Sequence, residues 1–399
     1  MNALARLACL AALICLAACS GSGTPKVTAE QAAAANAQAA REAPAEYRSR
    51  YAELLTGGEQ DYVLRAMRLG LDAIHSGDHA FAAKVFDQAI RRVAALQEGS
   101  TQADRAKSKF VAEQEKWFKG ENYERSSLYL YRGLLYLEAG DYGNAAACAK
   151  RCELEDVTNN EQTQGDWYSA EWLLAMASLL QGDPGTARDA LARAANFPSK
   201  QGLVPKPDAD WNVIIIGEAG RGPIKVRRGR YGEQLFIEEG SCRTLRLTVG
   251  AGDAKPVVTA AAENLYYQAS TRGDRKVDHI LHGKAVFKDA TNMAGDAAIV
   301  AGAGTALTSD NQTQSLVGLG LIVGGVISKA ISGAAEPQAD IRAWDNLPHS
   351  LFLTGLRCPP GAAKIRIEAR EGNESVVSTV TKDITVSGSN KTYIWLKFP

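Results

Sequence analysis

The sequence predicts an α+β protein, in which an N-terminal all-α domain of helix pairs precedes a C-terminal α+β domain. The second domain is expected to contain a Gly-rich helical hairpin and a small antiparallel β-sandwich. Two observations support this division. From 46 to 200 the apolar residues recur with the 3.6-residue period of helices, and from 208 onward the period shortens toward two between Gly-rich turns.

Composition excludes several classes of protein. Hydrophobic residues make up 46% and charged residues 23% of the 399 residues, so the chain is neither disordered throughout nor a polytopic membrane protein. Lys plus Arg and Asp plus Glu both count 45, which leaves no net basic field to attract nucleic acid. We therefore expect no nucleic-acid partner.

The N-terminus has the pattern of a secretory signal peptide. A basic residue, Arg6, precedes an apolar run from Leu7 to Ala17 that is too short to span a membrane. Small residues then lead to Cys19, an ending that resembles the lipobox of bacterial lipoproteins. We predict that residues 1–18 are removed and that acyl chains, palmitate among them, anchor Cys19 in membrane lipid. The alternative is an ordinary signal peptide that leaves Cys19 as a free thiol.

The segment after the predicted cleavage site, 19–45, is interpreted as a tether. It is rich in Ala, Gln and Glu, contains Pro25 and Pro44, and shows no apolar periodicity. Ser20 rather than Asp follows the cysteine, which by resemblance to Gram-negative lipoproteins favours the outer membrane. We therefore expect the folded part to face the periplasm from that membrane.

The helical domain, 46–200, contains three Gly-Asp turns that begin at Gly77, Gly140 and Gly182. After each turn, small residues stand where two helices touch in a tetratricopeptide (TPR) unit. The turns are unevenly spaced, and insertions such as Gln97–Trp117 separate the units. We therefore predict a TPR-like domain, and the alternative is a generic helical bundle with Gly-Asp corners.

The C-terminal half divides into a strand-rich segment with a Gly/Ala-rich helical hairpin, 208–340, and a β-sandwich-like region, 341–399. The predicted strands are Trp211–Ile216, Gln234–Ile237, Arg243–Val249, Lys255–Thr259, Leu351–Leu353, Lys364–Ala369, Ser375–Val380, Ile384–Val386 and Tyr393–Lys397. A helical pattern over Ala261–Lys288 follows the first group of strands. The hairpin covers Ile299–Ile331, where Gly320 and Gly324 stand four residues apart. We predict a soluble hairpin packed against the strands, and the alternative is a hairpin that inserts into the membrane.

A basic segment, Arg221–Arg230, follows the first predicted strand and contains five basic residues. Glu233, Glu238 and Glu239 come shortly after it and offer partners for these charges. We predict a hairpin with a solvated basic face. The alternative is a phosphate-binding nest formed with the preceding glycines.

Asp340, Arg342 and Trp344 alternate along a segment between the helical hairpin and the sandwich, so an extended backbone places all three on one side. The carboxylate and the guanidinium can pair, and the indole can cover them from water. We predict that these residues form a structural clasp between the hairpin and the sandwich. A ligand site is the alternative.

Four cysteines remain in an oxidising compartment once Cys19 is acylated and the signal peptide is removed. Cys148 and Cys152 lie four residues apart on one helix face, where a disulfide would be strained. The possible disulfide is therefore Cys242 with Cys358.

Several short motifs carry a resemblance to a known family. They are Gly217–Lys225, Ala262–Leu265, Asp340–Trp344 and Pro359–Gly361, together with the Gly-Asp turns. In this order they resemble an uncharacterised family of bacterial TPR-containing lipoproteins. The resemblance implies a cell-envelope location and a two-part build, and it implies no reaction.

No enzyme motif supports a catalytic function. The sequence has no P-loop, no Gly-x-Ser-x-Gly elbow, no Cys-x-x-Cys pair and no His-Glu-x-x-His. His279 and His282 lack further metal ligands nearby, and His75 and His79 flank a turn where solvated polar residues are expected. We therefore predict no catalytic residue, no cofactor and no metal site.

The predicted function is a non-enzymatic scaffold that docks an unidentified cell-envelope protein on its helical domain. Aromatic side chains of that domain are the candidate anchors for the partner. They are Trp117, Tyr123, Tyr129, Tyr131, Trp167 and Trp172. The alternative is a membrane-active envelope component that uses 299–331, and a periplasmic hydrolase is the least expected function.

Overall fold

The computed structural model describes residues 27–98, 116–156, 164–199, 202–252, 254–271, 338–388 and 390–399. Helices precede strands along the chain, so the predicted α+β class is confirmed. The contacts divide the chain into two compact units, Met1–Glu59 and Gln60–Pro399. The signal peptide, Cys19, the two histidines of 278–282 and the Gly-rich hairpin Ile299–Ile331 lie outside the described residues. Among the residues described, no helix combines the length and apolar character needed to cross a membrane.

The first unit contains helices where the sequence predicted a tether. They are α2 (Ala29–Glu42), the short 3₁₀ helix Ala45–Tyr47 and α3 (Arg48–Thr56). Thr28 and Gln31 form a capping box at the start of α2, and alanine has the highest helix propensity. Ala35 and Ala39 are buried, which adds packing to that propensity. The segment 19–45, interpreted as a tether, therefore contains a helix over 29–42 that the sequence analysis did not predict.

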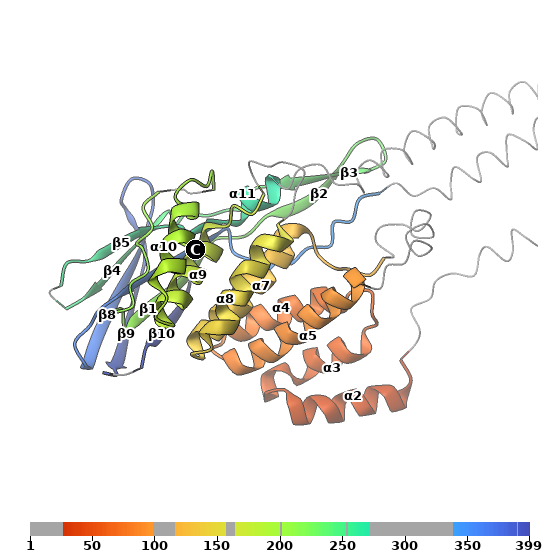
Figure 1. The fold of residues 1–399 in the computed structure, drawn as a ribbon. Coiled ribbons are helices and arrows are strands. Elements are labelled where there is room, and N and C mark those ends of the chain that lie inside the picture. The colour runs from red at the N-terminus through yellow and green to blue at the C-terminus, as the bar shows by residue number, and fades with distance from the viewer. Residues whose placement is uncertain are drawn as a thin grey trace, which may run out of the picture. The chain divides into compact units, whose positions relative to one another are not determined.

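The second unit begins with three helix pairs, which lie side by side in Figure 1. The helices are α4 (Tyr62–His75), α5 (His79–Glu98), α7 (Asn122–Glu138), α8 (Tyr142–Glu155), α9 (Tyr168–Leu180) and α10 (Pro184–Ala194). Each pair turns at a predicted glycine, and Gly77, Gly140 and Gly182 all have positive φ. The aspartate after the second and third glycine caps the next helix through its side chain, as Asp141 does for the Asn144 amide.

Small residues let the paired helices approach. A Cβ atom added to Gly70 of α4 would lie 2.4 Å from the Phe86 ring of α5, and one added to Gly133 of α7 would lie 2.6 Å from Leu173 of α9. These contacts explain why the sequence places glycine inside two helices that are otherwise strongly helix-forming. The helix pairs therefore depend on close packing that larger side chains would prevent.

The strands form two four-stranded sheets and one hairpin. The strands are β1 (Val213–Ala219), β2 (Ile224–Arg228), β3 (Gln234–Glu238), β4 (Arg246–Ala251), β5 (Val257–Ala260), β6 (Glu263–Asn264), β7 (Ser350–Leu356), β8 (Gly361–Arg370), β9 (Val376–Val386) and β10 (Thr392–Phe398). One sheet has the order β10-β1-β7-β6 and the other β5-β4-β8-β9, and β2 pairs only with β3. Helix α11 (Leu265–Ser270) follows β6.

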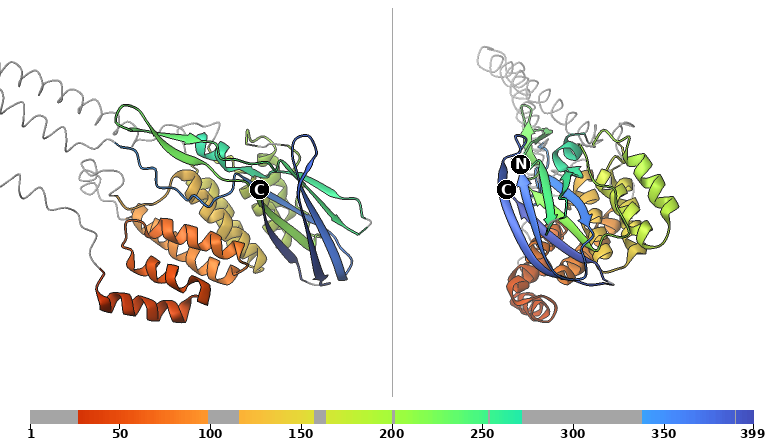
Figure 2. Two further views of the ribbon diagram at one scale, coloured as in Figure 1. Left: turned by 180° about the vertical axis from the view of Figure 1, so that it is seen from behind. Right: turned by 90° about the vertical axis from the view of Figure 1, so that its left-hand side faces the viewer.

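The two sheets share one apolar core, as expected of a sandwich. Val213 and Phe352 come from the first sheet, and Leu247 and Ile367 come from the second; all four belong to one buried cluster. Strand β1 is buried along its whole length and pairs with β10 in parallel and with β7 in antiparallel. Figure 2 shows these strands together although their sequence positions are far apart.

The predicted boundary between 208–340 and 341–399 does not divide the sandwich. Strand β10 completes the sheet of β1, and β8 pairs with β4, so each sheet uses strands from both predicted regions. A fully buried central strand needs a hydrogen-bonded neighbour on each side, and here those neighbours come from the C-terminal region. The sandwich therefore includes strands from 213 to 398.

Polar contacts join the helix pairs to the first sheet. His75 Nε2 lies 2.6 Å from Glu218 Oε2 of β1, and His79 Nδ1 lies 2.8 Å from Glu138 Oε2. The Trp395 indole of β10 also donates to Glu138 and packs against the His79 ring. The two histidines therefore bind carboxylates between helices and sheet, and the prediction of a solvated turn is wrong for them.

Candidate functional site

The predicted clasp forms, but with a different neighbour. Arg342 pairs with Asp340, with Nη2 2.6 Å from Oδ2, and its Nη1 lies 2.7 Å from Asp61 Oδ1 at the start of α4. It also donates to the backbone carbonyl of Lys116. The segment has no strand pairing, and it contacts both the helical domain and the β2–β3 hairpin, because Arg227 of β2 donates to the Ala339 carbonyl. The clasp therefore joins this segment to the helices and to that hairpin, and not to the sandwich as predicted.

Trp344, the third predicted member, is 2% exposed. Its ring lies 6.0 Å from the rings of both Phe86 in α5 and Tyr131 in α7, measured between centroids. Its backbone amide donates to Glu124 Oε1 of α7. Burial of this indole between two helices fixes the segment on the helical domain.

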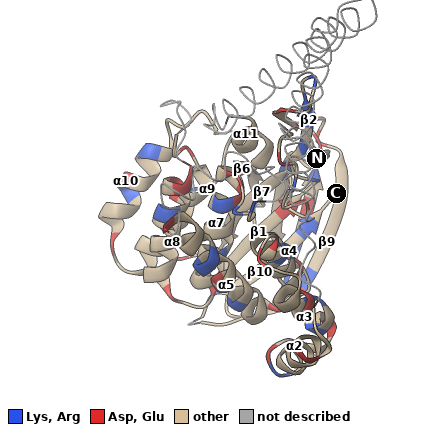
Figure 3. Cartoon of the chain, turned by 90° about the vertical axis from the view of Figure 1, so that its right-hand side faces the viewer, with Lys and Arg blue, Asp and Glu red and all other residues tan. Residues whose placement is uncertain are grey.

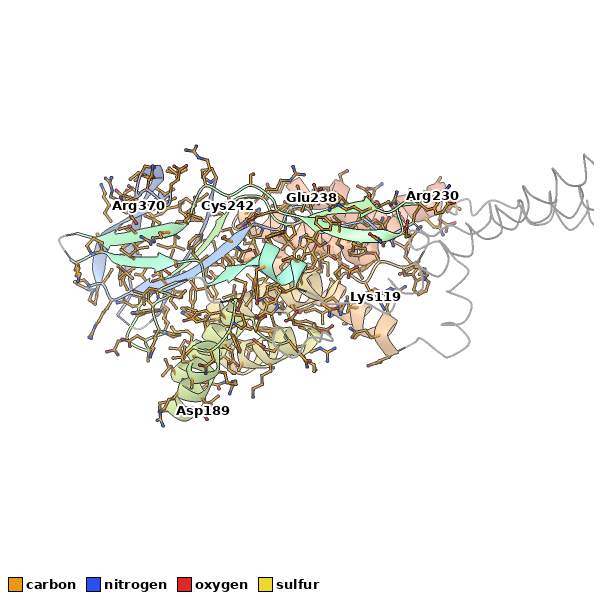
Figure 4. The ribbon with its side chains drawn as sticks, turned by 90° about the horizontal axis from the view of Figure 1, so that it is seen from above. Lys119, Asp189, Arg230, Glu238, Cys242 and Arg370 are labelled. Carbon is orange, nitrogen blue, oxygen red and sulfur yellow. The ribbon has the colours of Figure 1, made fainter. Side chains whose placement is uncertain are left out.

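A buried ion pair that the sequence did not predict lies next to the clasp. Lys225 of β2 places Nζ 2.7 Å from Glu124 Oε2, and both side chains are at most 2% exposed. Lys225 also donates to the backbone carbonyl of Arg342. The basic segment therefore forms a hairpin as predicted, but one of its five basic residues is internal. Figure 4 shows Arg230 at the far end of this hairpin from Cys242.

Most of the predicted aromatic anchors are unavailable to a partner. Trp117 is 53% exposed, and the other five are buried. Tyr131 packs with Trp344, and the Trp172 indole donates to the Pro205 carbonyl and stacks on Trp211. Large aromatic side chains fill the spaces between helices and loops, so these residues form the core instead of a binding surface.

The predicted disulfide is not formed in the structure. Cys242 and Cys358 are free, as are Cys148 and Cys152. Both members of the expected pair pack against the sandwich core, and Cys242 donates to the Thr244 carbonyl. They therefore act as small apolar side chains.

A pocket of about 500 Å³ opens between α8, α9 and α10. Its lining comprises Ala149, Lys150, Glu153, Gly165, Ala170, Glu171, Leu174, Arg193, Asn196 and Phe197. Arg193 binds Glu171 through two hydrogen bonds, of 2.5 and 2.8 Å. The pocket has the size of a small-ligand site, with an apolar wall and a few charged groups.

Glu153 is the unusual residue of this pocket. Its Oε1 atom is enclosed and accepts no hydrogen bond from the described part of the chain. Burial, followed by the charges of Glu171, Glu263, Asp156 and Asp166, raises the pKa of Glu153 to about 10. The side chain is therefore protonated at neutral pH.

Three further carboxyl groups lie close enough to Glu153 to affect its pKa. Burial raises the pKa of Glu263 to about 8 and that of Asp156 to about 7, and it raises the pKa of Asp166 as well. Glu263 accepts hydrogen bonds from Ser169 and Gln268, but none of the three has a basic partner among the residues described. Figure 3 shows both acidic (red) and basic (blue) segments where α8, α9 and α10 lie together.

No pattern in the sequence indicated this pocket. Its charged residues come from three helices, and Glu153 and Arg193 are far apart in the sequence. In the sequence each of them resembles a residue on a solvated helix face. In the described part of the chain no three His, Cys, Asp or Glu side chains are arranged to hold a metal ion.

Comparisons with models of known protein families, with curated proteins and with solved structures give no match for this chain. The site must therefore be interpreted from its own chemistry.

Proposed function

We propose that the protein is a lipid-anchored scaffold on the periplasmic face of the outer membrane, and that its helical domain docks another cell-envelope protein without catalysing a reaction. In this proposal Cys19 carries the anchor and the three helix pairs are TPR-like units. Consecutive helix pairs of this kind create concave surfaces that receive peptides or helices.

The observation that supports docking most directly is the pocket between α8, α9 and α10. It lies between two successive helix pairs, and it has an apolar wall next to charged groups, which is the combination found at protein-binding surfaces. The exposed positions Lys150 and Asn196 belong to its lining. A partner segment that enters the pocket would pass these two residues.

Site-specific photo-crosslinking in cells tests the proposal. A photoreactive residue at Lys150 or at Asn196 should capture the same envelope protein. The matched control is Asp189, which is exposed on α10 but does not line the pocket, and it should capture none. Capture of lipid alone, or equal capture at Asp189, would contradict the docking function.

The anchor is tested separately. Cys19→Ala should leave an unprocessed or soluble chain, because no acyl acceptor remains at the predicted lipobox. Membrane fractionation with mass determination of the mature N-terminus checks this. Normal processing and outer-membrane recovery of the variant would contradict lipid anchoring.

A further inference from the structure

We propose that the interface between the helix pairs and the first sheet is a pH-sensitive device, which closes when its titratable groups are protonated and loosens when they lose their protons. Two contacts carry this response. In the first contact, His75 of α4 meets Glu218 of β1, and in the second, Glu263 of β6 meets the start of α9. The inference concerns a conformational equilibrium of the fold and does not depend on the docking function.

The first contact joins the first helix pair to the fully buried strand of the sheet. His75 Nε2 lies 2.6 Å from Oε2 of Glu218, whose side chain is 2% exposed. A hydrogen bond to a carboxylate requires the hydrogen on Nε2, so a second proton would bind Nδ1. The His75 side chain is 21% exposed, which lets water deliver that proton. Protonation therefore turns a neutral hydrogen bond into an ion pair with a buried carboxylate.

Further titratable groups approach Glu218 and His75 from the neighbouring elements. Tyr131 of α7 lies next to Glu218, and burial, followed by the charge of Glu218, raises the pKa of this tyrosine, so its phenol stays neutral. Lys397 of β10 is the register partner of Glu218 and is exposed to water, which screens its charge. Asp78, in the turn after α4, accepts a hydrogen bond from the Phe81 amide. These groups leave His75 as the counterion of Glu218.

The second histidine of this turn is less suited to gain charge. His79 Nδ1 lies 2.8 Å from Glu138 Oε2, and the Trp395 indole of β10 donates to the same carboxylate. Nε2 of His79 is enclosed and has no hydrogen-bond partner in the described part of the chain. A proton added there would create a buried donor without an acceptor. His75 is therefore the pH-sensitive group of the first contact, because histidine is the side chain that changes charge near neutral pH.

The second contact joins the third helix pair to β6 and α11. Glu263 is 0% exposed, and it accepts hydrogen bonds from the Ser169 amide and hydroxyl at the start of α9, at 3.2 and 2.9 Å. Gln268 of α11 donates to Glu263 at 2.9 Å and also reaches the Asp166 carbonyl. The Tyr267 hydroxyl donates to the Asp166 carboxyl at 3.0 Å. These shared donors place two carboxyl groups close together between helix and sheet.

The groups around Glu263 make its ionised form costly. They are Cys152, Glu153 and Asp156 of α8, Asp166 before α9, and Tyr267 of α11. The basic group near this set is Arg193, which is bound to Glu171. Burial raises the pKa of Glu263 to about 8 and that of Asp156 to about 7. Because an open contact would let water solvate these charges, loss of their protons favours opening.

Both contacts respond to pH in the same direction. On acidification the first contact gains an imidazolium beside a buried carboxylate, and the second contact holds neutral carboxyl groups. When the pH rises, the first contact loses this charge attraction and the second gains buried like charges. The closed state therefore binds more protons than the open state, and linkage favours it as the pH falls.

The clasp provides a matched contrast, because its ion pairs use lysine and arginine. Lys225 pairs with Glu124, and Arg342 pairs with Asp340 and Asp61. Lysine and arginine side chains keep their charge between about pH 5.5 and about pH 8.5. The clasp should therefore hold its segment equally well throughout the range in which the helix–sheet interface loosens.

Hydrogen–deuterium exchange of the full chain in detergent, read by mass spectrometry, tests this inference. Exchange at about pH 5.5, about pH 7 and about pH 8.5 is scaled to the intrinsic amide rates, so that protection factors can be compared. From the lowest to the highest pH, protection should fall at least about fivefold at 69–79 and 392–398, around the first contact, and at 164–180 and 261–271, around the second. It should change less than about twofold at 339–347 of the clasp and in β4 and β8.

Two variants assign the response to the two contacts. His75→Gln keeps a hydrogen-bond donor for Glu218 but cannot gain charge, so it should flatten the pH response around the first contact and leave the second unchanged. Glu263→Gln has the shape of the protonated acid and should have the reverse effect. Glu239→Gln removes the carboxylate that pairs with His349 outside this interface; its side chain is 56% exposed, and it is the control that should change neither response.

The possible outcomes decide the inference. Protection that is independent of pH, that rises with pH, or that falls equally at the clasp and in β4 and β8 would each overturn it. A response that both variants leave unchanged would overturn it too. If Glu263→Gln does not fold, Asp156→Asn removes the neighbouring carboxyl group, which accepts from the Gly165 amide, and takes its place under the same criteria. No partner enters the measurement, so the result is independent of the docking function.

Discussion

The clasp and the surroundings of the pocket both contain several carboxyl groups of the second unit. Those of the clasp have basic partners, whereas most of those around the pocket do not. In the clasp, Glu124 is paired with Lys225, and Asp340 is paired with Arg342. Around Glu153, the side chains of Asp156, Asp166 and Glu263 have no basic partner among the described residues. A buried carboxylate with a counterion holds segments together, whereas burial without a counterion raises the pKa of a carboxyl group and favours its neutral form. The first group therefore stabilises the fold through ion pairs, and the second group is accommodated by protonation.

The largest expected effect comes from breaking the buried pair of the clasp. Lys225→Met leaves Glu124, which is 0% exposed at its side chain, without its counterion. We expect the free energy of unfolding to fall by about 3–5 kcal/mol. Denaturant unfolding of the variant measures this loss. Lys364→Met, in a pair whose side chains are 68% and 81% exposed, is the control, and an equal loss in both variants would contradict the assignment.

Removal of the clasp guanidinium should cost less. Arg342→Ala leaves Asp340 and Asp61 unpaired, but their side chains are 21% and 38% exposed and water screens them. We expect a loss of about 2 kcal/mol in the free energy of unfolding. Thermal unfolding checks the loss. Unchanged stability would contradict the structural role of Arg342.

The clasp was predicted from the sequence only in part. The alternation of Asp340, Arg342 and Trp344 indicated that they act together, and the first two do pair. Their partner across the fold could not be predicted, because Asp61 lies 281 residues away and no local pattern links the two positions. The Gly-Asp turns and the alternating strands were predictable because their signals lie in neighbouring residues. Long-range pairs leave no such local signal.

The pocket and the sheet order were beyond the local patterns. The pairing of β1 with β10 joins segments whose order in the sheet depends on tertiary packing. The burial of Lys225 within the predicted hairpin could not be predicted, because its partner Glu124 lies 101 residues away in the sequence. Helix α2 was missed because its alanines lack an apolar stripe, although its capping box at Thr28 and Gln31 was present in the sequence. In the sequence Glu153 resembles a surface residue, whereas the fold encloses its side chain.

The third effect is a change in pH dependence. The pKa of Glu153 is about 10 in the folded chain and about 4.3 in an unfolded chain, so the folded state binds more protons between these values. Stability is therefore greatest at low pH in this window and falls as pH rises, by up to about 1.4 kcal/mol per pH unit for this group. Glu153→Gln removes this contribution, and denaturant unfolding across the window should show a shallower decline. An unchanged slope would contradict the protonated state of Glu153.

The smallest effect is expected at the exposed hairpin. Arg228 and Glu238 lie 3.5 Å apart with side chains 53% and 49% exposed. Such pairs contribute little because water and salt screen them, so Arg228→Gln should change the free energy of unfolding by less than about 0.5 kcal/mol. A loss as large as that of Lys225→Met would show that the hairpin charges belong to the structural group.

The most direct test of the contrast between paired and unpaired carboxylates is a titration of the Glu153 carboxyl carbon by nuclear magnetic resonance. The full chain would carry carbon-13 glutamate, and the Glu153→Gln variant would assign the signal. Because burial and four neighbouring carboxyl groups raise its pKa to about 10, Glu153 should remain protonated at neutral pH in the free chain. A Glu153 carboxyl that is already ionised at neutral pH would contradict the account.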